Sequence, residues 1–271
     1  MIPFTKMNGC KNEYIFVDCF HNQIENPAEL ARAVSSRQPG GVGSDGLILV
    51  CPSDVADVKM RIFNSDGSEA EMCGNGSRCV AKFAYENGLT DKKKISLETL
   101  AGIKYLEILD NGNVSVNMGR PVVDEENITI GILSGRIVSM GNPHFVIVAP
   151  WLDKFDTKEL DRLSVARLGP PIENDPIFPN KTNVEFIHIL DEKNIKMRVW
   201  ERGAGETPAC GTGACAAVAA CVKRGLVGGS VTVRLPGGNL DIYWPGCQDI
   251  IMNGDAVEMH KGQYYFPKKQ R

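Results

Sequence analysis

One stretch of this sequence occurs twice at a constant spacing, and this repeat limits what the chain can fold into. Residues 58–76 read VKMRIFNSDGSEAEMCGNG, and residues 195–213 read IKMRVWERGAGETPACGTG. The two segments align without a gap at an offset of 137 residues, the difference between 195 and 58. The same offset places Gly88-Leu89 over Gly225-Leu226. Self-similarity over this length predicts two halves with the same local structure.

Each copy of the repeat predicts a strand, a polar loop and a helix. Residues 58–63 and 195–200 alternate β-branched or aromatic residues with polar ones, as a half-buried strand does. The loop that follows is rich in polar residues and Gly, and helix formers then continue as far as Gly88 and Gly225. The second helix, 214–222, consists of Ala, Val and Cys, so we expect a sheet to wrap around it.

Each repeat also delivers one cysteine, Cys73 or Cys210, at the start of its predicted helix. Free backbone N–H groups and the positive end of the helix dipole favour a thiolate at such a position. Glycines one and three residues after each cysteine leave room for a ligand carboxylate against the same amides. The other seven cysteines lack this context, and we interpret them as small buried hydrophobes.

Composition excludes several classes of function. The net charge is −3 and the longest run of basic residues is Lys92–Lys94, which argues against nucleic-acid or membrane-surface binding. No apolar stretch approaches the roughly 20 residues of a membrane span, and the N-terminus lacks a secretory pattern, so we expect a cytoplasmic protein. Nine cysteines without a framework of spacings predict reduced thiols. Their spacings and four dispersed histidines do not fit a metal site.

We predict two domains, with residues 1–119 in the first lobe and residues 120–256 in the second. The C-terminal strand, within residues 257–271, is expected to complete the first lobe. Both halves open with a strand, a loop and a strand, which places Asn12 and Asn142 in equivalent loops. A single loop Asn is typical of a turn, but we interpret this symmetric pair as two ligand contacts.

Other segments give local predictions. A short helix is expected over 27–36 with Asn26 as its cap, and a hairpin is expected in which strands 95–109 and 114–118 flank the turn 110–113. A charged helix is expected from Asp153, followed by a Pro-rich loop that contains Pro170, Pro171, Pro176 and Pro179.

Two thiols from two similar halves fit the inversion of a carbon centre. One thiolate removes a proton from one face of the carbon, and the opposing thiol supplies a proton to the other face. A cysteine with a pKa of about 8.5 or somewhat lower can take either state near neutrality. Because the α-proton of an amino acid is a weak acid, two helix N-termini aimed at the carboxylate would supply electrostatic stabilisation. No lysine lies in a recognisable pyridoxal-phosphate setting, so we expect no cofactor.

Four segments resemble the diaminopimelate epimerase family: NSDGSEAEMCGNGSRC at 64–79, ERGAGETPACGTGACAA at 201–217, MGNPH at 140–144 and LPGG at 235–238. The similarity covers essentially the whole chain. It implies an α/β (α+β) fold of two pseudo-symmetric domains, each a mixed sheet wrapped around a central helix. It also implies an isomerase, without a cofactor, that interconverts LL- and meso-2,6-diaminopimelate for lysine and peptidoglycan synthesis, as a homodimer in the cytoplasm.

The resemblance implies roles for individual residues. Cys73 would be the acid and Cys210 the base for the LL substrate, with the roles reversed for the meso substrate. Gly74-Asn75 and Gly211-Thr212 would hold the reacting carboxylate. The residues implied to recognise the substrate are Asn12, Asn64, Asn142, Asn183, Glu201 and Arg202. The Arg202 fork suits the distal carboxylate, although a surface ion pair is the alternative. Gly46 and His144 are further candidates, and His144 has an alternative interpretation as an ordinary loop histidine.

Some positions depart from the family pattern, and they leave the substrate open. Asn8, Lys11 and Glu13 replace residues of the family's first block, and Gly46 stands where many members have Gln. The alternatives are a racemase of another α-amino acid, a dithiol oxidoreductase and a non-catalytic amino-acid-binding protein. The lack of a C-x-x-C motif argues against the second, and the retention of both cysteines argues against the third. If the two sulfurs meet in a closed cleft, oxidation would join them and stop activity.

Overall fold

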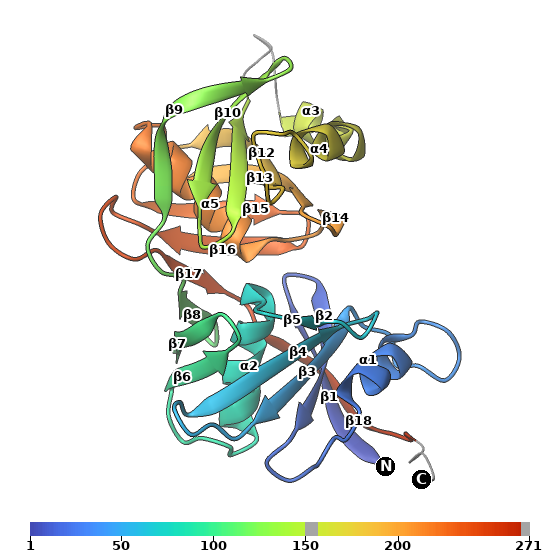
Figure 1. The fold of residues 1–271 in the computed structure, drawn as a ribbon. Coiled ribbons are helices and arrows are strands. Elements are labelled where there is room, and N and C mark those ends of the chain that lie inside the picture. The colour runs from blue at the N-terminus through green and yellow to red at the C-terminus, as the bar shows by residue number, and fades with distance from the viewer. Residues whose placement is uncertain (150–156, 267–271) are drawn as a thin grey trace. The chain divides into compact units, whose positions relative to one another are not determined.

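The chain forms two compact units in the computed structural model, which describes residues 1–149 and 157–266 (Figure 1). The first unit comprises Met1–Val116 and Gly254–Arg271, and the second comprises Asn117–Asn253. Residues 267–271 of the predicted C-terminal strand and residues 153–156 of the predicted charged helix lie outside the described residues. No helix in the described ranges has the length and apolar run that a bilayer crossing requires.

The first unit is built on a mixed sheet. Its strands are β1 (Ile2–Gly9), β2 (Asn12–Asp18), β3 (Gly46–Cys51), β4 (Val58–Asn64), β5 (Glu69–Ala70), β6 (Lys94–Thr99), β7 (Gly102–Ile108), β8 (Val114–Asn117) and β18 (Val257–Tyr264). They pair in the order β18-β1-β2-β3-β4-β6-β7-β8, and β5 adds to β4. The β2–β3 and β4–β6 pairs are parallel, and the others are antiparallel. β18 comes from the far end of the sequence and pairs with β1 from Ile2↔Tyr264 to Asn8↔Val257.

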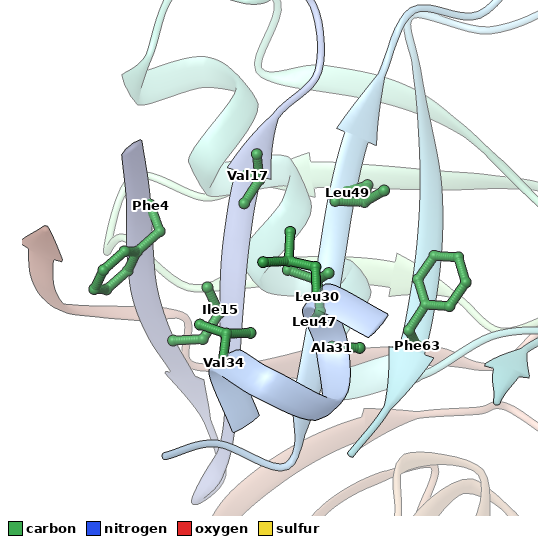
Figure 2. Close-up of a cluster of buried hydrophobic side chains, with 9 residues drawn as sticks. All are labelled: Phe4, Ile15, Val17, Leu30, Ala31, Val34, Leu47, Leu49 and Phe63. Atoms are coloured by element: carbon green, nitrogen blue, oxygen red, sulfur yellow. The ribbon is translucent and has the colours of Figure 1, made fainter. Parts of the chain in front are cut away.

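Helices α1 (Pro27–Ser35) and α2 (Gly74–Glu86) cover opposite faces of this sheet. Figure 2 shows the cluster under α1, which consists of Phe4, Ile15, Val17, Leu30, Ala31, Val34, Leu47, Leu49 and Phe63. Phe16 points to the other face, where its ring centroid lies 5.7 Å from that of Phe83 of α2. Because both faces are buried, β3 reads as a continuous apolar run. Each large side chain buried there contributes about 1.5–3 kcal/mol of transfer free energy.

The second unit repeats this topology. Its strands are β9 (Val122–Ile130), β10 (Leu133–Ser139), β11 (Pro143–Val148), β12 (Asn183–Asp191), β13 (Asn194–Glu201), β14 (Gly205–Thr207), β15 (Ser230–Leu235), β16 (Gly238–Tyr243) and β17 (Ile251–Gly254). They pair in the order β9-β10-β11-β12-β13-β15-β16-β17, with β14 on β13. The β11–β12 and β13–β15 pairs are the parallel ones. Strand by strand this is the order of the first unit, with β9 in the place of β18.

The central helix of the second unit is α5 (Gly211–Lys223). Every residue from Ala214 to Cys221 has no exposed surface, and α5 contacts β9, β10, β11, β12, β15 and β16. The prediction that a sheet encloses this apolar helix is therefore confirmed. Two further helices, α3 (Thr157–Arg162) and α4 (Val165–Glu173), pack on the other side of β12 and β13.

Three local predictions were wrong in part. Pro170 and Pro171 lie inside α4 and not in a loop, because Val165, Leu168 and Ile172 of this helix pack into the core with Phe186 and Trp200. This burial outweighs the hydrogen bonds that the prolines cannot make. The expected strand 95–109 is two strands, β6 and β7, separated by a tight turn before Gly102. Asn26 occupies the N-cap of α1, but its side chain makes no capping hydrogen bond.

Candidate active site

Cys73 and Cys210 occupy the same position in the two units, the N-cap of the central helix. The prediction that each cysteine begins a helix is thus confirmed. Each sulfur accepts a hydrogen bond from the N–H three residues on, with 3.4 Å from Gly76 N to Cys73 Sγ and 3.3 Å from Gly213 N to Cys210 Sγ. These N–H groups and the helix dipole stabilise negative charge on the sulfur.

The glycines in each first turn keep these helix ends open. A Cβ at Gly76 would lie 2.8 Å from Ile48 Cδ1, and one at Gly213 would lie 2.7 Å from an oxygen of Glu185. Gly74-Asn75 and Gly211-Thr212 are the first two residues of their helices, where backbone N–H groups have no partner within the helix. Both pairs can therefore donate to an anion, as the predicted carboxylate contact requires.

Uncharged side chains lie beside Cys73 in the first unit. The Tyr14 hydroxyl donates to Cys73 Sγ at 3.6 Å. The Asn75 side chain donates to Asn12 Oδ1 at 2.5 Å, so two of the predicted substrate contacts meet here. Cys73 itself is half-buried, which leaves part of its surface accessible.

Gly46 and Asn64 face each other on the neighbouring strands β3 and β4. Asn64 is exposed, and its amide donates to Ser68 Oγ at 3.0 Å. A Cβ at Gly46 would lie 2.3 Å from the Phe63 carbonyl oxygen and 3.1 Å from Tyr14 Cε1. The close approach of β4 therefore explains a glycine at position 46, where a longer side chain would force the strands apart.

The unusual residues of the first loop have structural explanations. Cys10 and Lys11 form the turn between β1 and β2 with φ angles of 51° and 63°, a strained region for side chains other than Gly or Asn. The Lys11 N–H donates to Asn8 Oδ1 at 2.8 Å, which fastens this turn. Glu13 forms an ion pair with Lys6 at 2.6 Å.

Ionisable side chains lie beside Cys210 in the second unit. His144 and Glu185 are fully buried, and their Nδ1 and Oε1 atoms are 2.7 Å apart. His144 Nε2 lies 3.1 Å from Asn142 Oδ1, and the Asn142 amide donates to Thr212 Oγ1 at 3.4 Å. The Thr212 hydroxyl lies 3.5 Å from Cys210 Sγ. One continuous network therefore joins three of the predicted site residues to Cys210.

The remaining candidates lie at the ends of β12 and β13. Asn183 Oδ1 accepts from the Arg202 N–H at 3.0 Å, and its amide donates to the Pro143 carbonyl at 2.8 Å. Glu201 accepts a hydrogen bond from the Thr207 hydroxyl. The exposed Arg202 guanidinium donates to the Asn180 carbonyl at 2.9 Å. Asn183 thus links the two strands and holds the backbone of Arg202.

Burial raises the pKa of the Cys210 thiol well above its ordinary value of 9.0. The negative charges of Glu201 and Glu185 add to this increase, whereas hydrogen bonds from Thr212 and Gly213 oppose it. Burial also raises the pKa of Glu201, and its bond with Thr207 opposes that shift. Cys210 therefore holds its proton in the free protein, and a cationic group on a ligand would favour its thiolate.

Sequence reasoning missed Tyr14 and Glu185, which contact Cys73 and His144 respectively. The repeat carried a signal for Glu185. At the offset of 137 residues Glu185 aligns with Ile48, so a charged residue takes the place of an apolar one in the second copy of this strand. A buried charge that appears in one copy of a duplicated strand points to a specific partner.

Solved structures share this two-lobed fold. A phenazine biosynthesis protein of the PhzF family from Bacillus anthracis superposes with a TM-score of 0.74 at 19% identity, covering 96% of this chain and 98% of that one. A hydroxyproline epimerase from Agrobacterium vitis gives a TM-score of 0.65 at 16% identity, covering 96% and 91%. At these identities the likeness concerns the fold. The fold and its paired N-cap cysteines define the class, an α/β protein of two lobes that share one topology and each begin a central helix with a cysteine.

The family follows from closer relatives. The family model for diaminopimelate epimerase matches residues 4–123 and 136–259. A diaminopimelate epimerase from Methanococcus maripaludis (strain S2) is 48% identical, covering 97% of this chain and 99% of its own length. One from Acetivibrio thermocellus is 46% identical, covering 96% and 97%. The chain belongs to the diaminopimelate epimerase family.

Proposed function

We propose that this protein interconverts LL- and meso-2,6-diaminopimelate, an isomerisation in lysine and peptidoglycan synthesis. The observation that carries the proposal is the pair of N-cap cysteines, one in each repeat of a chain that belongs to this family. Relatives of nearly equal length that are named for this activity support the same substrate.

In the proposed reaction, Cys73 and Cys210 act on opposite faces of the substrate α-carbon. One sulfur, as thiolate, takes the α-proton and becomes a thiol, while the other thiol gives its proton to the opposite face and becomes a thiolate. The product therefore has the inverted configuration and the two sulfurs have exchanged roles. For the LL substrate, Cys210 would be the base and Cys73 the acid.

The carbanion that forms between these steps requires stabilisation of its carboxylate. The N–H groups in the first turns of α2 and α5 are suited to that role, because they are fixed donors that do not have to reorganise during the reaction. The Asn12–Asn75 and Asn142–Thr212 contacts hold polar side chains at the same two helix ends. The mechanism proposed needs no cofactor.

Arg202 is proposed to select the substrate through its distal carboxylate. Within residues 1–149 and 157–266, its guanidinium donates to the Asn180 carbonyl and to no carboxylate, which favours a ligand contact over the surface ion pair. L-Lysine has the structure of diaminopimelate without its distal carboxylate. We expect turnover of LL-diaminopimelate and none of L-lysine, and a panel of other L-amino acids would reveal a racemase of different specificity.

The proposal is tested by incubation with LL-diaminopimelate in deuterated water without added cofactor. The wild-type protein should form meso product with solvent deuterium at the inverted carbon. Cys73→Ala and Cys210→Ala should each lower the rate by about a thousandfold or more, as expected for loss of a proton-transfer group. Cys221→Ala is a matched control, because Cys221 is buried in α5 away from its N-terminus. Inversion without deuterium, or activity retained in either alanine variant at the N-caps, would refute the two-thiol reaction.

We also propose a homodimer located in the cytoplasm. Sedimentation of the purified protein at several concentrations would test the dimer. A mass equal to that of one 29.6 kDa chain throughout would contradict it.

A further inference from the structure

Glu185 is a fully buried acid on β12, in a strand whose neighbouring residues are apolar. Its Oε1 atom lies 2.7 Å from His144 Nδ1. Among the described residues, its other oxygen, Oε2, has no hydrogen-bond donor. An ionised carboxylate in this setting is expensive unless a cation lies beside it. The geometry therefore calls for a positive charge on His144.

The contacts of His144 offer a hydrogen-bond acceptor to each ring nitrogen. The Nδ1 atom faces a carboxylate oxygen, which only accepts, so Nδ1 carries a hydrogen. The Nε2 atom faces Asn142 Oδ1 at 3.1 Å, because the amide group of Asn142 donates to Thr212. An amide oxygen also only accepts, so Nε2 carries a hydrogen as well. A ring that donates to both acceptors carries a proton on each nitrogen and is an imidazolium.

We propose that Glu185 is a positioning residue that holds His144 as an imidazolium and thereby fixes the Asn142 amide toward Thr212 and Cys210. Glu185 does not contact the reacting atoms in this role. A protonated His144 can only donate to Asn142 Oδ1. The Asn142 amide then donates to Thr212, whose hydroxyl lies beside Cys210 Sγ. This inference rests on the proposed function for its kinetic consequence, but not for its structural content.

The first unit supplies a natural comparison. Glu185 corresponds to Ile48, and His144 corresponds to Tyr14, because Tyr14 pairs with Gly46 as His144 pairs with Asn183. Tyr14 reaches Cys73 Sγ directly through its hydroxyl at 3.6 Å. No buried acid is needed behind a neutral phenol. The unit with a histidine at this position has a buried acid behind it, and the unit with a tyrosine has an isoleucine there. This difference is expected if Glu185 sets the protonation of the His144 ring.

The protonation state can be measured by nitrogen NMR of the free wild-type protein at neutral pH. The protein has four histidines, and the His144 signals are identified by their loss in His144→Gln. Both ring nitrogens should show the protonated signature. A neutral ring, with one bare nitrogen, would overturn the proposal whether or not the protein is an epimerase. This measurement needs no variant at position 185, so it stands even if such variants fold poorly.

Variants at position 185 test the consequence. Glu185→Gln preserves the shape and an acceptor for Nδ1 but removes the charge, so His144 should become neutral. Glu185→Asp keeps the charge and should keep the imidazolium. Glu206→Gln is the matched control, because it removes a carboxylate of the same unit that pairs with Arg198 at the surface; His144 should stay doubly protonated there.

Kinetics then separates a positioning role from a structural one. Where wild-type epimerisation is established, Glu185→Gln should lower kcat by about tenfold with little change in KM, a smaller loss than removal of a proton-transfer group. Glu185→Asp should recover most of that loss, and Glu206→Gln should match the wild type. An imidazolium retained in Glu185→Gln, or equal kcat in Glu185→Gln and the wild type, would overturn the proposal. If the wild-type protein does not epimerise the substrate, the proposed function is refuted. The NMR result alone then decides whether Glu185 holds His144 as an imidazolium.

Discussion

The two units place their buried charges differently on the same scaffold. In the first unit, Arg78 of α2 is fully buried, and it donates to the Asp255 carbonyl at 3.0 Å and to Cys10 Sγ at 3.4 Å. In the second, the equivalent position is Cys215, and the buried ionisable pair Glu185 and His144 lies at the N-terminus of α5. The two units thus share the strand order and the N-cap cysteine. The buried ionisable group of the first unit holds the C-terminal segment, whereas those of the second lie near the thiol.

The positions around each cysteine show the same divergence. Tyr14 in the first unit corresponds to His144 in the second, and Asn64 corresponds to Glu201 at the offset of 137 residues. Each neutral residue thus has an ionisable counterpart. A reaction that requires one thiol and one thiolate at the same time benefits from unequal surroundings. In the second unit, burial and the negative charges of Glu201 and Glu185 raise the pKa of the Cys210 thiol.

The largest expected effect concerns the anchoring charge. Arg78→Ala should lower the free energy of unfolding by about 3 kcal/mol, because it removes a buried side chain and a charged hydrogen bond to the Asp255 carbonyl. Cys215→Ala, at the same position of the other helix, should cost about 1 kcal/mol, since little more than a sulfur atom is lost. Urea unfolding followed by circular dichroism gives both values. Equal losses would show that the two central helices are supported in the same way.

The next effect tests the charge near Cys210. Glu201→Asn, which copies the residue of the first unit, should lower kcat/KM by about a hundredfold if Glu201 makes the predicted charged contact to the substrate. The shorter Asn also loses the bond with Thr207. Steady-state assay with LL-diaminopimelate measures the effect. Glu192→Asn is the control, because it changes an exposed acid of the same unit and should leave kcat/KM unchanged. A loss of less than a few-fold for Glu201→Asn would remove Glu201 from the site.

Cysteine reactivity provides a third and smaller difference. Iodoacetamide attacks the thiolate, so Cys210, which is buried and has a raised pKa, should react at least about tenfold more slowly than the half-buried Cys73 at neutral pH. The exposed Cys247 should react first and serves as the internal reference. Mass spectrometry of peptides from a time course gives the three rates. Labelling of Cys210 as fast as that of Cys247 would contradict its burial and its pKa.

Local features of the fold were predictable because their signals are local. The repeated Cys-Gly-x-Gly segment gave both helix starts, and Gly88 and Gly225 follow the helix ends with φ angles of 70° and 66°. The apolar composition of 214–222 predicted an enclosed helix. Side chains in one turn or one strand share a spacing that the sequence displays directly.

Contacts between distant segments were not predictable in this way. His144 and Glu185 are 41 residues apart, and Arg78 and Asp255 are 177 residues apart. Each contact depends on which strands are neighbours and in what register, and a shift by a single residue would turn Glu185 to the opposite face of the sheet, away from His144. Arg78 resembles a residue of a polar helix face until the C-terminal segment returns to cover it. The substrate roles of the candidate residues stay predictions for the same reason, since they depend on a bound ligand.

The smallest expected effect is a change of stability with pH. Burial raises the pKa of Glu201 above its ordinary value of 4.5, so the folded protein binds this proton more tightly than the unfolded chain does. The stability that Glu201 contributes is therefore present below pH 4.5 and is lost as the pH rises through the raised pKa. Glu201→Gln keeps an acceptor for Thr207 without the buried charge. Its melting temperature should exceed that of the wild type slightly at neutral pH and match it in acid, as calorimetry across the pH range would show. A difference that does not depend on pH would mean that packing, and not the charge near Cys210, distinguishes Glu201 from its neutral counterpart Asn64.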